Sequence, residues 1–82
     1  RGELKRALEL FKLITVIDNS SVSGYFNMGM VHWADSNYRA AAEAFFQAAL
    51  RSPDDQEVLR WAALAKKYTS RSIVYKDEAK SK

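Results

Sequence analysis

The sequence predicts an all-α fold of about four helices, arranged as antiparallel helical hairpins. Apolar residues recur every three and four positions over several stretches, which is the period of one face of an α-helix. Short polar segments separate these stretches, and their side chains bond their own backbone and interrupt helices. The clearest is Asp35–Asn37, which lies between two strongly periodic stretches and predicts a tight helical hairpin.

The first predicted helix runs from Glu3 to about Ile17. One face is formed by apolar residues three and four positions apart, and a second apolar strip lies beside it. The first face contains Leu4, Ala7, Leu8, Phe11 and either Ile14 or Thr15, and the second contains Leu10, Leu13, Val16 and Ile17. The helix closes at Asp18, and either Ser21 or Ser23 is expected to cap the next one.

The next two predicted helices, Ser23–Ala34 and Tyr38–Arg51, form the centre of the chain. Each presents one face with small residues beside large ones, which lets two backbones approach while the large side chains fill the flanks. Gly29 is the small residue of the first helix and Ala41 that of the second. The two faces consist of Tyr25, Met28, Gly29 and His32, and of Tyr38, Ala41, Phe45 and Ala48.

The stretch from Val22 to Asp55 resembles a tetratricopeptide repeat, whose signature is W-x2-L-G-x2-Y, then A-x3-F, then P, in about 34 residues. The positions on this pattern are Gly29, Tyr38, Ala41, Phe45, Ala48 and Pro53. The departures are Tyr25 in place of Trp, Met28 in place of Leu, and His32 in place of Tyr. The resemblance implies a fragment of an α-solenoid that serves as an interaction scaffold.

A second, partial match precedes the full repeat. Ala7-x3-Phe11 has the small–large spacing of Ala41-x3-Phe45, thirty-four residues earlier. The first helix therefore resembles the second helix of a preceding, truncated repeat. Because a single repeat buries its apolar face poorly, about three or more are needed for independent stability.

The last strong helix is predicted from about Asp55 to Tyr68, with Asp54 or Asp55 as its cap after Pro53. Residues 1–69 then form the helical domain and residues 70–82 a basic C-terminal tail. For the apolar cluster Arg71–Tyr75, a continuing helix packed on Trp61 is one interpretation. Lys76–Lys82 is predicted to be a solvated tail, mostly disordered when left alone.

The chain has 82 residues, a net charge of +3 and no cysteine. Lack of cysteine excludes a disulfide framework and a thiolate metal site, and suits an intracellular reducing compartment. No run approaches the ~18 apolar residues that span a bilayer, and the first residues do not show a signal-peptide pattern. Because the sequence begins at Arg1, we expect a processed precursor or part of a longer chain, and import into a mitochondrion or chloroplast stays open.

Catalytic chemistry has little support in this sequence, and we expect no enzyme activity, cofactor or metal. The single histidine, His32, lies on a predicted packing face, whereas a catalytic histidine needs a positioned partner. No pair of carboxylates converges, no nucleophile has a base at helical spacing, and the three glycines form no phosphate loop.

A stripe of large apolar residues on the second helix is the main candidate site. By the resemblance, the groove-facing positions of this helix are Ser23, Phe26, Asn27, Met30, Trp33 and Ala34. The alternative is that the helix Glu3–Ile17 covers the stripe internally, and the sequence leaves both open. The predicted partner-binding residues are Ser23, Phe26, Asn27, Met30, Trp33, Phe46 and Trp61.

The predicted function is a non-catalytic protein–protein interaction scaffold, as a small subunit or assembly factor of a larger complex. A clamp for a C-terminal carboxylate is incomplete here, because Asn27 is present but Ser23, Met30 and Ala34 supply no cation. An apolar or helical ligand fits better. The alternative is an adaptor that docks on RNA or an anionic membrane through its basic end. That end contains Lys66, Lys67, Arg71, Lys76, Lys80 and Lys82.

Overall fold

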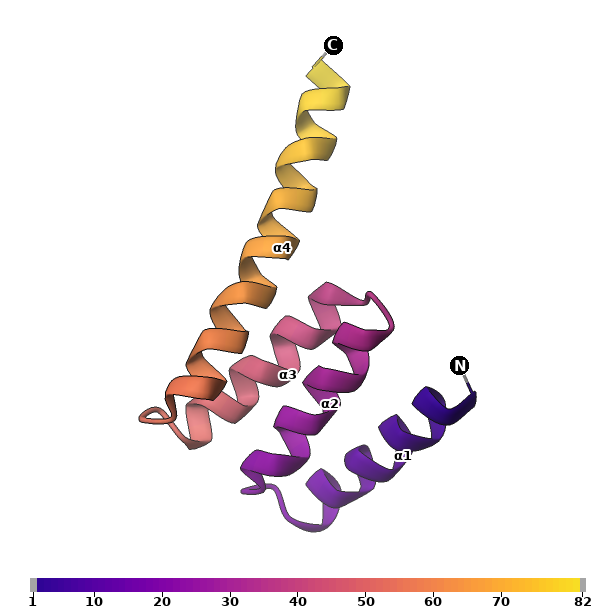
Figure 1. Ribbon diagram of the computed structural model, residues 1–82, viewed down its shortest axis with the longest axis vertical. Helices are drawn as coiled ribbons and strands as arrows, with labels where there is room; N and C mark the ends of the chain where they lie inside the picture. Colours follow the sequence, from indigo (N-terminus) through magenta and orange to yellow (C-terminus); the bar gives the residue numbers. More distant parts are fainter. Residues whose placement is uncertain (1, 82) are drawn as a thin grey trace.

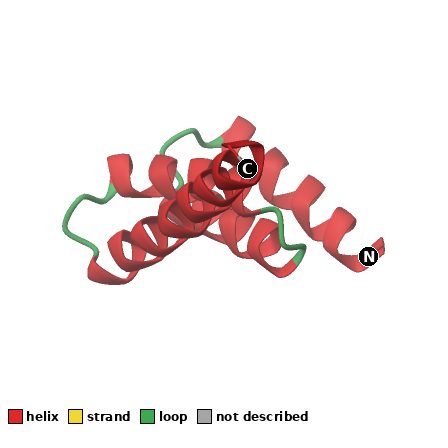
Figure 2. Ribbon diagram, turned by 90° about the horizontal axis from the view of Figure 1, so that it is seen from above, coloured by secondary structure: helices red, strands yellow, loops and turns green. Residues whose placement is uncertain are grey.

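Four α-helices make up the described chain. The computed structural model describes the backbone of residues 2–81 and the side chains of residues 2–69. The helices are α1 (Gly2–Ile17), α2 (Val22–Ala34), α3 (Tyr38–Arg51) and α4 (Gln56–Ser81), and no strand lies among these residues. In chain order, each helix packs against the next and runs back along it (Figure 1). Figure 2 shows the same helices from above, joined by short loops. The predicted all-α fold of helical hairpins is confirmed.

The turn between α2 and α3 consists of residues 35–37, as predicted. Ser36 has a positive φ of 59°, and its N–H donates to the Trp33 carbonyl at 3.0 Å. The N–H of Asn37 donates to the His32 carbonyl at 2.8 Å. These two bonds are those of a Schellman helix end, in which a left-handed residue lets the chain reverse. The polar turn residues therefore satisfy the last carbonyls of α2.

Side-chain caps begin α2 and α4, and the structure selects one of the two predicted residues in each case. Ser21 caps α2, because its Oγ accepts from the N–H of Gly24 at 3.0 Å. Asp55 caps α4, because its Oδ1 accepts from the N–H groups of Glu57 at 3.0 Å and Val58 at 3.3 Å. Each cap satisfies backbone donors that have no partner inside the helix.

The closest approach of α2 and α3 lies at Gly29. The ring of Phe45, which has no exposed surface, fills the space beside this glycine. A Cβ built on Gly29 would lie 2.5 Å from Cδ1 of Phe45 and closer still to Cε1, too close for any real side chain. The predicted role of Gly29 as the close-packing residue of the hairpin is confirmed.

A second close contact, between α1 and α2, was not predicted. A Cβ on Gly24 would lie 3.0 Å from Cγ2 of Thr15 and 3.2 Å from Cγ2 of Ile14. Thr15 is buried, and its hydroxyl donates to the Lys12 carbonyl at 2.7 Å, so burial leaves no polar group unsatisfied. A small residue therefore lies at both packed faces of α2.

Arg51, at the end of α3, holds the loop between α1 and α2 in place. Its guanidinium lies 4.1 Å from the centroid of the Tyr25 ring, within cation–π range. Its Nη2 donates to Oδ1 of Asn19 at 2.9 Å, and its Nη1 donates to the Gln47 carbonyl at 2.9 Å. One side chain thus connects α2, α3 and the preceding loop.

The last predicted helix, from about Asp55 to Tyr68, is longer in the structure, because α4 continues to Ser81, and the interpretation of Arg71–Tyr75 as a continuing helix is confirmed for the backbone. The hydroxyl of Thr69 donates to the Ala65 carbonyl at 3.0 Å, so this residue bonds within the helix and does not end it. The backbone of residues 76–81 is helical, whereas the sequence predicted a tail that is mostly disordered when left alone. Packing of Arg71–Tyr75 on Trp61 lies outside the described side chains. No helix in the described residues, including α4, combines the length and apolar character needed to cross a membrane.

The helix boundaries repeat along the chain. Thirty-four residues separate the starts of α2 and α4, at Val22 and Gln56, and the same interval separates the ends of α1 and α3, at Ile17 and Arg51. In chain order, α1–α2 and α3–α4 are therefore equivalent pairs, and the α2–α3 hairpin lies between them.

Candidate protein interaction surface

Aromatic side chains from α2, α3 and α4 meet in one cluster. Trp33 is at its centre, with ring centroids 4.9 Å from Tyr38, 5.3 Å from Trp61 and 5.1 Å from Tyr68. All three contacts are edge-on, which the charge distribution of aromatic rings favours. The full aromatic cluster contains Phe26, Trp33, Tyr38, Phe45, Trp61 and Tyr68.

The stripe of Phe26, Met30 and Trp33 packs toward α3 and α4. All three residues lie against the buried core formed by α3 and α4, and all three remain half-buried. In contrast, α1 packs on another side of α2, where its leucines line a cleft with Val31 and His32. The alternative in which α1 covers the stripe is therefore wrong. One edge of the stripe is packed, and the other is open.

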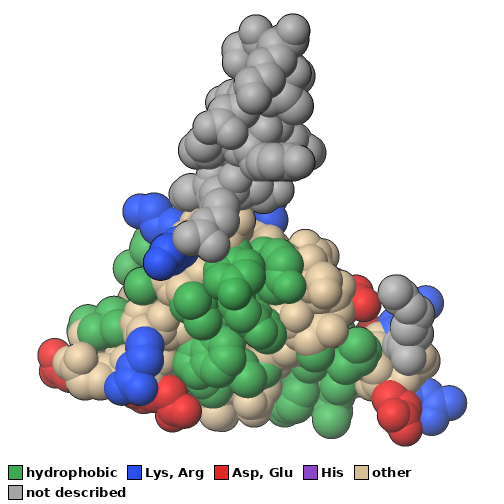
Figure 3. Space-filling model, turned by 45° about the horizontal axis from the view of Figure 1, so that its top comes forward, with side chains coloured by type: hydrophobic (Ala, Val, Ile, Leu, Met, Phe, Trp, Pro, Cys, Tyr) green, Lys and Arg blue, Asp and Glu red, His purple; other side chains and the backbone are tan. Residues whose placement is uncertain are grey.

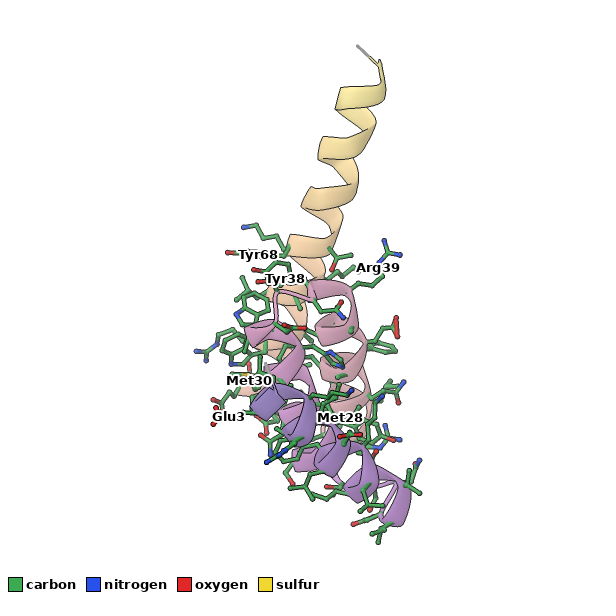
Figure 4. The ribbon with its side chains drawn as sticks, turned by 90° about the vertical axis from the view of Figure 1, so that its right-hand side faces the viewer. Glu3, Met28, Met30, Tyr38, Arg39 and Tyr68 are labelled. Carbon is green, nitrogen blue, oxygen red and sulfur yellow. The ribbon has the colours of Figure 1, made fainter. Side chains whose placement is uncertain are left out.

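The open edge continues from α2 onto α4. On α4, Trp61, Leu64 and Tyr68 share one stripe, because they are three and four residues apart. Leu64 is 37% exposed and Tyr68 is 40% exposed. Figure 3 shows hydrophobic side chains gathered over the middle of the molecule, and Figure 4 shows Met30, Tyr38 and Tyr68 on one side with Arg39 on the other. We call this surface the aromatic face and define it as Phe26, Met30, Trp33, Trp61, Leu64 and Tyr68.

The structure brings four of the seven predicted partner-binding residues together on the aromatic face. These are Phe26, Met30, Trp33 and Trp61. Two others lie on α2 at helical spacing from Met30: Ser23 is exposed, with its Oγ 3.4 Å from that of Ser21, and Asn27 is half-buried.

Phe46, in contrast, lies apart from the aromatic face. It is 57% exposed and lines a separate cleft of about 430 Å³ between α3 and α4. Leu64 and Tyr68 were absent from the predicted site, although their spacing from Trp61 could have placed them there.

The basic residues of the alternative prediction are only partly described. Lys66 and Lys67 are exposed. Lys66 also lines the cleft between α3 and α4, beside Ala63 and Phe46. The remaining four, Arg71, Lys76, Lys80 and Lys82, lie outside the described side chains, so a continuous basic surface stays a prediction.

The single histidine lies where α1, α2 and α3 meet. His32 lines the cleft shared with α1 and the cleft shared with α3. Burial lowers its pKa and Lys12 lowers it further, while Asp35 and Glu43 oppose that shift. Among residues 2–69, no three His, Cys, Asp or Glu side chains come close enough to share a metal ion.

The lowered pKa of His32 predicts that acid weakens the fold. The unfolded chain takes up the proton first as the pH falls below the ordinary histidine value of about 6.5, so the free energy of unfolding decreases from there down through the folded-state pKa. Urea denaturation at about pH 7.5 and about pH 5.5 measures this decrease. Because the chain has one histidine, His32→Gln should reduce the decrease, and an equal decrease in that variant would assign it to other groups.

Comparison with known proteins adds no relative: the chain matches no protein-family model, no curated protein and no solved structure.

Proposed function

We propose that this chain is a non-catalytic protein–protein interaction module built on a tetratricopeptide-like repeat, and that it serves as a small subunit or assembly factor of a larger complex. The observation that carries the proposal is the aromatic face, in which Phe26, Trp33 and Trp61 are half-buried and the side chains of Leu64 and Tyr68 are exposed. Exposed apolar patches mark partner sites. Aromatic side chains are frequent anchors of such interfaces.

The repeat assignment rests on spacing and packing together. The helix boundaries recur after 34 residues, which is the length of one tetratricopeptide repeat. Gly29 and Ala41 stand at small-residue positions of that repeat, and the contact of Gly29 with Phe45 gives these positions a packing reason. These features support a scaffold whose helices present surfaces to other proteins.

The partner that fits this face is an amphipathic helix with an apolar stripe. α2 contains no Lys, Arg, Asp or Glu, so it offers no charged anchor for a peptide carboxylate. A helical ligand can instead place apolar side chains, three and four residues apart, against Met30 and Trp33 of α2 and Leu64 of α4. The flanking Arg60 and Lys67 on α4 are exposed, which favours a partner helix with acidic residues beside its stripe.

Affinity capture with matched leucine variants tests this proposal. Wild-type protein, Leu64→Glu and Leu50→Glu are used as baits in extracts of the source cells, and retained proteins are identified by mass spectrometry. Leu64 is 37% exposed on the aromatic face, whereas Leu50 is 59% exposed on α3. We expect one or more partners to be retained by wild type and by Leu50→Glu, and to be lost with Leu64→Glu, because a buried charge in an apolar interface is strongly unfavourable.

Salt separates this function from the alternative of a basic tail on RNA or membrane. An apolar interface persists at high ionic strength, whereas phosphate contacts weaken steeply. Retention that withstands salt and fails with Leu64→Glu supports the aromatic face. If all three baits retain the same proteins at low salt and lose them at high salt, the basic residues and not the aromatic face would be the binding site.

A further inference from the structure

We propose that copies of this chain associate head to tail, with α1 of one copy packed against α4 of the next. This contact uses surfaces at the two ends of the helix row and leaves the aromatic face free, so it is independent of the proposed function. Four observations carry it: two exposed apolar surfaces, their repeat relationship to the α2–α3 interface, a pair of opposite charges, and a pair of apolar residues.

The first exposed surface is a stripe on α1. Leu10, Leu13 and Ile17 are 56%, 53% and 76% exposed, and their spacing of three and four places them on one side of the helix. The opposite side of α1, with Leu4 and Leu8, faces α2. Three exposed leucine and isoleucine side chains in one stripe are more than a solvated helix face normally carries.

The second exposed surface lies on α4 at the other end of the row. Leu59 is 38% exposed. Beside it opens the cleft of about 430 Å³ between α3 and α4, lined by both helices. Its lining consists of Ala42, Glu43, Phe46, Ala62, Ala63 and Lys66.

The 34-residue interval relates these two surfaces to the two sides of the α2–α3 interface. Adding 34 to the α2 positions that face α3 gives three exposed positions of α4, Leu59, Ala63 and Lys66, and the half-buried Ala62. Subtracting 34 from the α3 positions that face α2 gives the exposed stripe of α1 together with the half-buried Phe11. On the α2 side, Tyr25, Met28, Gly29 and His32 correspond to Leu59, Ala62, Ala63 and Lys66. On the α3 side, Ala44, Phe45, Gln47 and Arg51 correspond to Leu10, Phe11, Leu13 and Ile17.

Charges at the corresponding positions are complementary. In the α2–α3 interface, His32 and Glu43 line the same cleft. Their counterparts are Lys66 on α4 and Glu9 on α1, both exposed. If α1 of one copy packs on α4 of another in the way that α3 packs on α2, Lys66 of one copy therefore lies beside Glu9 of the other. Such a pair favours this register over others.

Apolar residues match at the other end of the same interface. Arg51 lies over the ring of Tyr25 in the hairpin. The counterparts are Ile17 on α1 and Leu59 on α4, which would bury each other in the contact between copies. A polar contact inside one chain thus corresponds to an apolar contact between chains, as expected where association depends on burial of apolar surface.

One substitution makes this contact looser than the hairpin. Ala63 stands where α2 has Gly29, and a Cβ at Gly29 would collide with Phe45. Because Phe11 is the counterpart of Phe45, the methyl group of Ala63 holds α1 of the second copy farther away. The association is therefore reversible and weaker than the packing within a chain. Arg6 on α1 corresponds to Ala40 on α3. Its long side chain must therefore extend into solvent to leave room for α4 of the second copy.

Blocking each surface separately tests the proposal on the full chain. Leu10→Glu blocks the α1 surface, Ala63→Glu blocks the α4 surface, and Leu50→Glu is the control, at a residue of α3 that is 59% exposed and belongs to neither surface. Mass is measured by sedimentation from about 1 µM to 1 mM, the range of weak to moderate dissociation constants. Circular dichroism confirms that each variant is helical. We expect wild type and Leu50→Glu to form growing chains, since a head-to-tail contact does not close.

Complementation gives the decisive result. Each blocked variant alone should stay monomeric, and an equimolar mixture of Leu10→Glu and Ala63→Glu should form a 1:1 dimer, because each supplies the surface that the other lacks. A wild type that stays monomeric at every concentration would overturn the proposal. Self-association of either blocked variant alone, or a mixture that stays monomeric, would overturn it too.

Charge exchange provides a second measurement if a blocking variant fails to fold. Lys66→Glu should weaken association of the chain by about two- to five-fold, as for an exposed ion pair. Combining it with Glu9→Lys should restore the wild-type affinity. Equal affinities of wild type, the single variant and the double variant would show that these residues do not face each other.

Discussion

Replacing Gly29 with leucine is expected to destabilise the α2–α3 hairpin more than any other single change at a glycine. Even a Cβ at this position would lie 2.5 Å from Cδ1 of Phe45. The ring cannot move aside, because Phe45 is fully buried. Overpacking of a tight core costs about 1–3 kcal/mol or more of unfolding free energy. Urea or thermal denaturation followed by circular dichroism measures this loss.

The other two glycines are matched controls for this prediction. Gly2→Ala should leave stability nearly unchanged, because a Cβ there would meet nothing within 4 Å beyond its chain neighbours and the backbone of its own helix. Gly24→Ala should fall between the two, since its Cβ would lie 3.0 Å from Thr15. A Gly29→Leu variant that unfolds like wild type would show that α2 and α3 do not meet at this residue.

Truncating Trp33 to alanine is the second change with a large expected effect. The indole contacts the rings of Tyr38, Trp61 and Tyr68, so its removal eliminates the ring contacts that connect α2 with α3 and α4. Large-to-small changes at buried tryptophans cost about 3–5 kcal/mol, and we expect the lower end because Trp33 is half-buried. Hydrogen exchange should show that α4 loses protection before α1 does.

Phe46→Ala is the control, because this phenylalanine is 57% exposed and lies outside the aromatic cluster. Its effect should stay within about 0.5 kcal/mol, as for most surface substitutions. If Trp33→Ala proves as stable as Phe46→Ala, the aromatic cluster does not hold α4. Because Trp33 both packs and lines the face, its loss cannot separate binding from stability. Leu64 lies at the edge of the face, so Leu64→Glu can separate an effect on binding from an effect on stability.

Features determined by neighbouring residues were predictable from the sequence. The turn at residues 35–37 follows from short polar side chains that bond nearby backbone. The caps at Ser21 and Asp55 follow from the same chemistry. The close contact of Gly29 was predictable because the glycine occurs at helical spacing among large residues, which marks a packing point even without knowledge of the partner ring.

Contacts between distant residues were not predictable in the same way. Arg51 bonds Asn19, thirty-two residues away, and nothing near either residue indicates that contact. Apolar periodicity showed that α2 is buried on more than one side, but it could not tell which neighbour covers which side. The end of α4 was missed because Thr69 is compatible with a helix when its hydroxyl bonds the preceding turn.

The candidate site was predicted only in part for the same reason, because its residues come from different helices. Phe26, Met30 and Trp33 were identified because their stripe is visible within one helix. Leu64 and Tyr68 could have been grouped with Trp61 by their spacing, but the sequence does not show that this stripe of α4 lies beside Trp33 of α2, which the ring contacts establish. Phe46 was assigned to the same site because exposed aromatic residues look alike in a sequence, although it lies in a different cleft.

The most direct test of the aromatic face uses the two tryptophans of the chain. The sequence contains only Trp33 and Trp61, and their ring centroids lie 5.3 Å apart on this face. A ¹⁵N-labelled sample therefore gives two indole N–H signals, both of which report on the proposed site. On titration with a partner isolated by affinity capture, we predict that both signals shift and saturate together. Indole signals that stay unchanged while the partner binds elsewhere would contradict the proposed function.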